Sequence, residues 1–171
     1  KSLQGAPLGA LGLGEVGREV ATRAKAMGME ILYFQRTRLP AEIEAESGAR
    51  YVSYDELLEA SDFISVHLPL NESTEGMVDS ASFARMKPGA IIANISRAQI
   101  IDRDAMIAAL DSGRLGGAGL DVHYAEPGDP DEPLKTYSNV ILSPHVAVAQ
   151  RAHNMADTAE MVANLTAALG G

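Results

Sequence analysis

The sequence contains no cysteine, which excludes disulfide bonds and metal sites built from thiolates. No metal site of another kind is predicted. The absence of cysteine fits a reducing compartment, so we expect a cytoplasmic location.

Positive charge and long apolar runs are also scarce. The chain has 14 Lys and Arg against 23 Asp and Glu, a net charge of −9, so it has no electrostatic footprint for nucleic acid. No apolar run approaches the roughly 20 residues of a membrane-spanning helix, and no signal-peptide pattern opens the chain. We therefore expect neither a nucleic-acid partner nor a membrane partner.

The length and composition suit one globular domain with a sizeable core. The chain has 171 residues, of which 46% are hydrophobic and 22% are charged. We assign residues 1–171 to a single domain. Because the chain begins at Lys1 and ends in "ALGG", we expect it to be part of a longer protein.

Short apolar runs alternate with amphipathic segments throughout the chain. Strands are expected at 7–11, 30–34, 49–52, 62–68, 89–95, 116–122 and 139–145, and helices at 15–28, 40–48, 55–60, 102–113 and about 148–169. This alternation predicts an α/β fold with a doubly wound parallel sheet, covered by helices on both faces. The acidic, proline-rich stretch 126–133 is expected to be a solvated surface loop, apart from Glu126.

The stretch "LGLGEVGREV" (11–20) contains Gly12-x-Gly14-x-x-Gly17 between an expected strand and an expected helix. In this setting, typical of a Rossmann fold, each glycine has its own task. Gly12 permits a tight turn, Gly14 lets the backbone approach a pyrophosphate, and Gly17 lets helix and strand pack closely. The helix N-terminus attracts the phosphates, so we predict a dinucleotide site. The alternative is a glycine-rich turn required only for packing.

The residue expected to hold the adenosine ribose is not acidic. An Asp or Glu usually ends the second strand of such a site, but here Gln35 stands there, followed by Arg36 and Arg38. A carboxylate repels a 2′-phosphate, whereas arginine pairs with it. We therefore expect NAD(P) as the cofactor, with a modest preference for NADP over NAD. The alternative is that both arginines are solvated surface charges.

The second half of the chain resembles a known family. The stretch "NISRAQIIDRDAMIAALDSGRLGGAGLDVHYAEP", followed by "NVILSPHVAVA", is similar to the D-isomer-specific 2-hydroxyacid dehydrogenases, and the resemblance extends over essentially the whole chain. It implies a homodimer formed mainly through this domain. It also implies that Arg97, Glu126 and His145 carry the chemistry.

The chemistry of these three residue types agrees with that implication. Histidine has a pKa near neutrality, so His145 can take a hydroxyl proton and return it in the reverse direction. Glu126 would orient the imidazole and favour its protonated form, and Arg97 would bind the substrate carboxylate. The alternatives are a structural histidine, a loop carboxylate and an ordinary salt-bridge arginine.

The resemblance also implies further contacts with the cofactor. Asp121 would accept a hydrogen bond from the nicotinamide carboxamide, although a turn cap is the alternative. His67 and Pro69 would line the adenine side, and Thr74 would reach a phosphate. The remaining expected cofactor contacts are Glu15, Val16 and Ile95.

The chain departs from the family in three places. Ala98 and Gln99 follow Arg97 where the family has glycine next, and the segment after His145 lacks the usual glycine. These side chains would narrow the pocket or alter its specificity. Family members also carry a substrate domain built from both chain ends, which we expect to be absent from this sequence.

Three functions remain open from the sequence. The leading hypothesis is the cofactor domain of an NAD(P)-dependent oxidoreductase that moves a hydride between the cofactor and a small 2-hydroxy or 2-keto acid. The alternative is a corepressor-like module that senses nicotinamide dinucleotides without significant turnover. A methyltransferase is disfavoured, because it explains neither the third glycine nor the later motifs.

Overall fold

The computed structural model describes residues 2–125 and 129–147. Within them, seven strands form one sheet in which every neighbouring pair is parallel. The strands are β1 (Pro7–Leu11), β2 (Glu30–Phe34), β3 (Ala49–Tyr51), β4 (Phe63–Val66), β5 (Ala90–Asn94), β6 (Leu115–Leu120) and β7 (Val140–Leu142). Parallel strands bring all of their carboxyl ends to the same edge of the sheet.

The strand order reverses between β1 and β4. The sheet runs β3-β2-β1-β4-β5-β6-β7, so the chain builds outward from β1 in one direction and then returns to build in the other. Open α/β sheets bind ligands at such a switch point, outside the carboxyl ends of the strands. The predicted doubly wound parallel sheet is confirmed.

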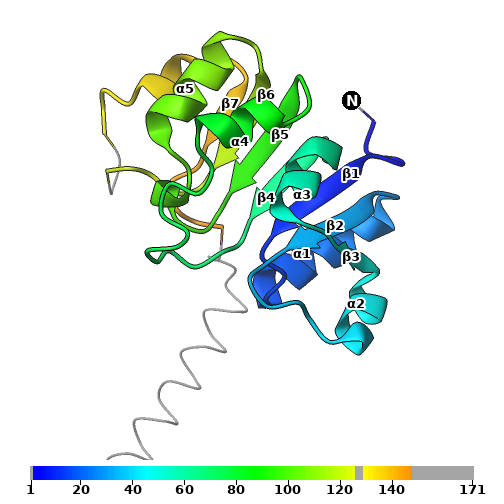
Figure 1. The fold of residues 1–171 in the computed structure, drawn as a ribbon. Helices are drawn as coiled ribbons and strands as arrows, with labels where there is room; N and C mark the ends of the chain where they lie inside the picture. Colours follow the sequence, from blue (N-terminus) through cyan, green and yellow to red (C-terminus); the bar gives the residue numbers. More distant parts are fainter. Residues whose placement is uncertain (1, 126–128, 148–171) are drawn as a thin grey trace, which may run out of the picture.

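The helices form a layer on each face of the sheet (Figure 1). The α-helices are α1 (Glu15–Ala26), α2 (Ala41–Ser47), α3 (Tyr54–Ala60), α4 (Ser80–Arg85) and α5 (Arg103–Asp111). Alternate side chains of β1 separate the two cores: Leu8 and Ala10 pack on the side of α1, and Leu11 packs on the side of α3. None of the helices in the described ranges is long and apolar enough to cross a membrane.

Side-chain caps define where several helices begin. Asp102 accepts a hydrogen bond of 2.8 Å from the Ala105 N–H and so caps the start of α5. Ser53 and Asp79 cap α3 and α4 in the same way. These caps satisfy backbone N–H groups that a helix cannot satisfy internally.

The structure adds elements that the sequence pattern did not indicate. Helix α4 and the short 3-10 helices η1 (Ala98–Ile100) and η2 (Pro133–Thr136) are too short to show a clear hydrophobic period. The expected closing helix at 148–169 lies outside the described residues.

One expectation for the acidic stretch 126–133 was wrong. Glu132 is only 8% exposed rather than solvated, and it accepts a hydrogen bond of 3.0 Å from Arg103. It also accepts from the Leu134 N–H at the start of η2. The Arg103 guanidinium and the Leu134 N–H replace the water that the buried carboxylate loses. The sequence did not indicate this burial, because Arg103 lies far from Glu132 along the chain.

The centre of the larger core provides a test of the packing. Ile92 is fully buried in β5 and lies between Ile64 of β4 and Ala118 of β6. We expect Ile92→Ala to lower the free energy of unfolding by about 2–5 kcal/mol and Ile92→Val by only about 0.5–1.5 kcal/mol. Urea titrations followed by circular dichroism would measure both, and equal losses would contradict this packing.

Candidate functional site

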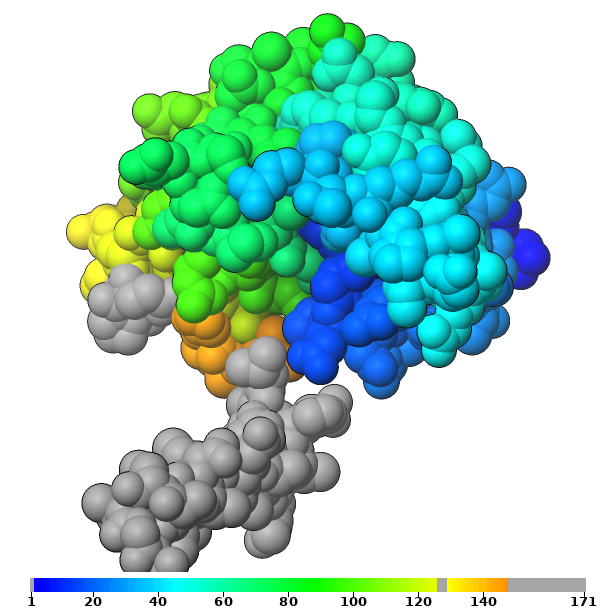
Figure 2. Space-filling view, turned by 60° about the horizontal axis from the view of Figure 1, so that its bottom comes forward, coloured from blue at the N-terminus to red at the C-terminus, as the bar shows by residue number. Residues whose placement is uncertain are grey.

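A pocket of about 510 Å³ lies where the carboxyl ends of β1, β2 and β4 meet. Figure 2 shows this side of the molecule, where the blue N-terminal segment meets the green middle of the chain. The pocket is lined by Gly12, Gly14, Phe34, Gln35, Arg36, Thr37, His67, Leu68, Pro69, Asn71, Ser73, Thr74 and Met77. It therefore sits at the switch point of the sheet and contains seven of the predicted cofactor residues.

The three glycines have different surroundings, and those of Gly12 and Gly17 agree with the turn and the close packing expected there. Gly12 has a positive φ of 93°, and a Cβ there would lie 3.1 Å from the His67 carbonyl oxygen. A Cβ at Gly17 would lie 2.4 Å from the Gly12 carbonyl oxygen, so helix and loop touch through backbone. Gly14 caps α1 without a side chain and faces open space, so the first turn of α1, with Glu15 and Val16, is open to a phosphate.

Gln35 connects the glycine loop to the end of β2. Its Oε1 accepts a hydrogen bond of 3.0 Å from the Leu13 N–H, and its Nε2 donates one of 2.7 Å to the Thr37 carbonyl. The side chain at the expected ribose position thus holds the pocket wall as well as lining it. The sequence showed that this residue was not acidic, but it did not show this bracing.

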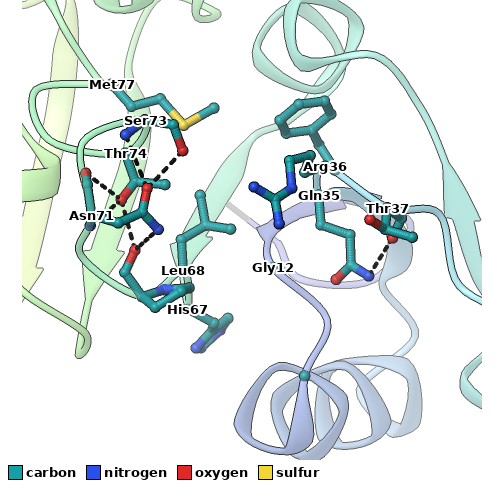
Figure 3. Close-up of a pocket in the computed structure, with 13 residues that line it drawn as sticks. Gly12, Gln35, Arg36, Thr37, His67, Leu68, Asn71, Ser73, Thr74 and Met77 are labelled. Atoms are coloured by element: carbon teal, nitrogen blue, oxygen red, sulfur yellow. Dashed lines mark hydrogen bonds between the residues drawn. The ribbon is translucent and has the colours of Figure 1, made fainter.

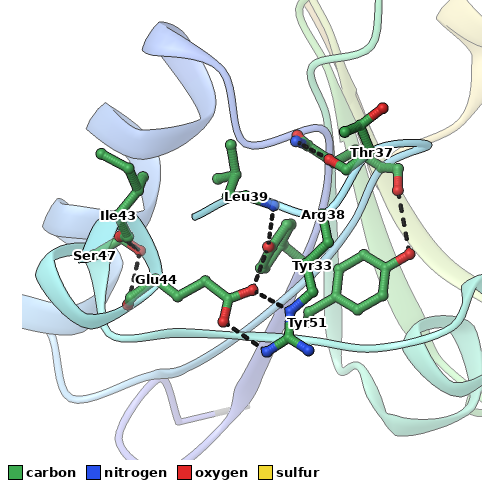
Figure 4. A network of polar contacts seen from close by, with 9 residues as sticks. Tyr33, Thr37, Arg38, Leu39, Ile43, Glu44, Ser47 and Tyr51 are labelled. Carbon is green, nitrogen blue, oxygen red and sulfur yellow. Dashed lines mark hydrogen bonds and ion pairs between the residues drawn. The ribbon is translucent and has the colours of Figure 1, made fainter. Parts of the chain in front are cut away.

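The structure separates the two arginines that follow Gln35. Arg36 lines the pocket (Figure 3) and forms no ion pair with any residue in the described ranges. Arg38 is not among the lining residues: its guanidinium forms two hydrogen bonds of 2.8 Å to the Glu44 carboxylate on α2 (Figure 4). Of the two arginines, Arg36 alone is therefore placed to contact a ligand in the pocket.

The loop after β4 forms the opposite wall. Both ring nitrogens of His67 are buried and have no hydrogen-bond partner among the described residues. Burial lowers the pKa of His67 from 6.5 to about 4, so the ring is neutral at physiological pH. Thr74 donates a hydrogen bond of 2.6 Å to the Pro69 carbonyl and accepts one of 2.9 Å from the Asn71 N–H. Its hydroxyl thereby stabilises the loop.

Arg97 lies at the carboxyl end of β5, outside the pocket lining. The buried side chain of Asn94 holds the turn that carries it, because Nδ2 donates to the Arg97 carbonyl at 2.9 Å and Oδ1 accepts from the Ser96 N–H at 2.9 Å. The Arg97 side chain is exposed and donates to the Ser96 carbonyl at 2.7 Å. Ile95, in the same turn, is half-buried. A polar residue ending an apolar strand was the available signal for Asn94.

Asp121 clamps the turn that contains His145. It follows β6, is 4% exposed, and accepts hydrogen bonds from Ser143 Oγ (2.5 Å), the Val146 N–H (2.9 Å) and the Ala147 N–H (2.7 Å). Burial raises the pKa of Asp121, but these hydrogen bonds and the nearby charge of His145 together outweigh burial, so the pKa is lowered. His145 lies within the clamped turn at a positive φ of 55°. The contact of Asp121 with a nicotinamide carboxamide remains a prediction.

Arg97 and His145 thus follow β5 and β7, which flank β6 and Asp121. Glu126, the third expected catalytic residue, lies outside the described residues. The two departures after Arg97 differ in exposure: Ala98 is 3% exposed within η1, whereas Gln99 is exposed. Only Gln99 therefore presents its side chain to solvent beside Arg97.

Residues 1–147 match the family model for the D-isomer specific 2-hydroxyacid dehydrogenase, NAD binding domain, and the chain belongs to this family. Among curated relatives, it is similar to a glyoxylate reductase of Korarchaeum cryptofilum, with 46% identity over 93% of this chain and 47% of the relative. It is also similar to the 4-methyl-2-oxopentanoate reductase A of Aspergillus oryzae, with 48% identity over 84% of this chain and 43% of the relative.

Solved structures agree with this assignment. A glyoxylate reductase from Paecilomyes thermophila superposes with a TM-score of 0.92 at 40% identity, over 99% of this chain and 51% of that one. The holo form of Rhodotorula graminis D-mandelate dehydrogenase superposes with a TM-score of 0.83 at 41% identity, over 88% of this chain and 44% of that one. The chain spans about half the length of the relatives that it matches.

The glycines provide a matched pair of substitutions. Gly14→Ala adds a methyl group in open space, so it should disturb folding less than Gly17→Ala, which forces a Cβ against the Gly12 carbonyl. We expect Gly17→Ala to lower the free energy of unfolding by about 1–3 kcal/mol. Gly14→Ala should instead weaken dinucleotide binding by about tenfold or more, a loss of about 1.4 kcal/mol. Calorimetry of unfolding and of NADH binding would show whether the two losses separate; a Gly14→Ala protein that binds normally would contradict the predicted phosphate approach.

His67 makes stability sensitive to mild acid. Its pKa is 6.5 when unfolded and about 4 when folded, so the unfolded state binds more protons and stability falls as pH drops through this window. From pH 7 to pH 5 the loss attributable to this group is about 2 kcal/mol. His67→Leu should remove most of that loss in urea titrations at the two pH values. The lowered pKa values of Asp121 and Glu44 act mainly below this range, and an unchanged acid sensitivity would show that His67 is not the cause.

Proposed function

We propose that the chain is the cofactor half of an NAD(P)-dependent oxidoreductase that reduces small 2-keto acids to D-2-hydroxy acids and catalyses the reverse oxidation. The observation that carries this proposal is the shared edge of the sheet. The glycine loop and its pocket follow β1, β2 and β4, and Arg97 and His145 follow β5 and β7 on the adjoining strands. A dinucleotide bound across the switch point would direct its reactive end towards β5–β7.

The cofactor, when bound, supplies or accepts the hydride. In reduction, His145 donates a proton to the keto oxygen, and in oxidation it accepts the hydroxyl proton. The exposed Arg97 guanidinium binds the substrate carboxylate through two parallel hydrogen bonds and polarises the keto group. Glu126 orients the His145 imidazole and favours its protonated form. The roles of these three residues follow from the family resemblance and from their chemistry.

Buried polar groups prepare these side chains for the reaction. Asn94 donates a hydrogen bond to the backbone carbonyl of Arg97, and Asp121 accepts three hydrogen bonds from the turn that contains His145. A catalytic group held in place before the substrate arrives loses less entropy on reaching the transition state. Both contacts fix the backbone from which the Arg97 and His145 side chains project, which supports a defined placement of the two residues along this edge.

We propose that the pocket accepts both cofactors and modestly prefers NADP. The residues that line the pocket include no Asp or Glu, so no carboxylate among them repels a 2′-phosphate. Arg36 is the one basic arginine or lysine in this lining. A guanidinium pairs with phosphate through charge-assisted hydrogen bonds. Arg38 contributes less than the sequence suggested, because Glu44 already binds it.

Small 2-keto acids such as glyoxylate are the proposed substrate class, since the relatives carry the names of glyoxylate and 4-methyl-2-oxopentanoate reductases. These names favour turnover over the corepressor-like sensing role.

Two further proposals concern assembly and location. A homodimer formed through this domain is proposed from the family resemblance, and a cytoplasmic location is proposed from the absence of cysteine.

The proposed function is tested with a panel of glyoxylate, hydroxypyruvate and pyruvate, each assayed with NADH and with NADPH on the full-length protein.

His145→Ala should lower kcat by about 10² to 10⁴ while leaving NADH binding nearly unchanged. Arg97→Lys keeps the charge but loses the planar fork, so it should raise KM and lower kcat. Steady-state kinetics and direct binding of NADH would separate these effects. Near-normal turnover by His145→Ala would refute the mechanism, and binding without turnover of any acid would favour the sensing role.

A further inference from the structure

The two arginines after β2 have opposite electrostatic situations, although one residue separates them. Arg36 faces the pocket without an ion pair in the part of the chain that the structure describes. Arg38 carries an equal charge, but the Glu44 carboxylate neutralises it through two hydrogen bonds of 2.8 Å. Thr37, between them, lines the pocket, so the backbone that carries Arg38 passes directly beside the site.

Glu44 is itself held firmly on the inner side of α2. Its side chain is 12% exposed, and its Oε1 also accepts a hydrogen bond of 2.5 Å from the Tyr33 hydroxyl. The Tyr33 hydroxyl accepts in turn from the Leu39 N–H at 3.0 Å, within the same segment (Figure 4). Hydrogen bonds from Arg38 and then Tyr33 lower the pKa of Glu44 to about 2, so the carboxylate is charged at any physiological pH.

A second contact keeps the Arg38 guanidinium beside α2 and β3. Its Cζ lies 5.5 Å from the centre of the Tyr51 ring, a separation at which a cation attracts the face of an aromatic ring. The Tyr51 hydroxyl donates a hydrogen bond of 3.3 Å to the Gln35 carbonyl, so Tyr51 contacts both ends of residues 35–38. Arg38 is still 63% exposed, which leaves its side chain room to adopt another rotamer.

We propose that Glu44 determines cofactor specificity by holding Arg38 away from the pocket. One arginine then meets the 2′-phosphate of NADP, and the pocket discriminates weakly between NADP and NAD. Without the Glu44 charge, the exposed Arg38 side chain joins Arg36 at the phosphate and strengthens NADP binding alone. This inference rests on the proposed dinucleotide function.

The test compares Kd values for NADPH and NADH by calorimetry on the full-length protein. Glu44→Gln keeps an oxygen that accepts from Tyr33 but removes the charge that binds Arg38. It should tighten NADPH binding roughly tenfold, the effect of one charge-assisted hydrogen bond, and leave NADH binding unchanged. Adding Arg38→Met to Glu44→Gln should abolish the gain, whereas Arg38→Met alone should have a much smaller effect on NADPH.

The control is Glu56→Gln, which removes another arginine–carboxylate ion pair by releasing Arg50 on β3 from its 2.9 Å contact. It should change neither Kd. The inference is overturned if Glu44→Gln leaves the NADPH-to-NADH ratio unchanged, if it weakens both cofactors together, or if its gain survives Arg38→Met. A wild-type protein that binds neither dinucleotide would instead overturn the proposed function, and this inference with it.

Discussion

The backbone contact between the glycine loop and α1 is the constraint on which the site depends. Position 17 has no room for a Cβ, because the Gly12 carbonyl oxygen would lie 2.4 Å from it. This close approach brings the first turn of α1 against the end of β1, at the switch point of the sheet. Gly14, which caps this helix, lines the pocket and adds no side chain there, so the helix N-terminus is open to a ligand. The partial positive charge of the helix end therefore lies where a pyrophosphate is expected.

Polar side chains near strand ends hold the remaining loops of the edge. Gln35 after β2 binds the glycine loop, Asn94 at the end of β5 binds the turn of Arg97, and Asp121 after β6 binds the turn of His145. Gln35 and Asp121 connect segments that lie beside one another only in the fold, whereas Asn94 binds its own turn, two and three residues further on. Burial makes an unpaired polar group costly, so each contact strongly favours one loop conformation. These contacts therefore define the shape of the edge.

Much of the fold could be predicted because it depends on local patterns. The period of apolar residues predicted the seven strands and the longer described helices. Helix α4 was not predicted, because its six residues include only one large apolar side chain, Phe83, and so show no apolar period. The glycine spacing and the catalytic motifs predicted which strands would carry the site. Their order along the chain already implied that Arg97 and His145 would meet one edge of the sheet.

The sequence by itself determined the fold class, the family and the residue types along the binding edge, since these depend on periodicity and on motifs within a few residues. Only the tertiary structure decided which of those residues face the pocket. Arg36 and Arg38 look equivalent in the sequence, but a carboxylate six residues beyond Arg38 binds one and not the other. The sequence did not show that the Asp121 oxygens hold the turn of His145, more than twenty residues away. A charge acts on whatever lies within a few ångströms, and folding alone sets those distances.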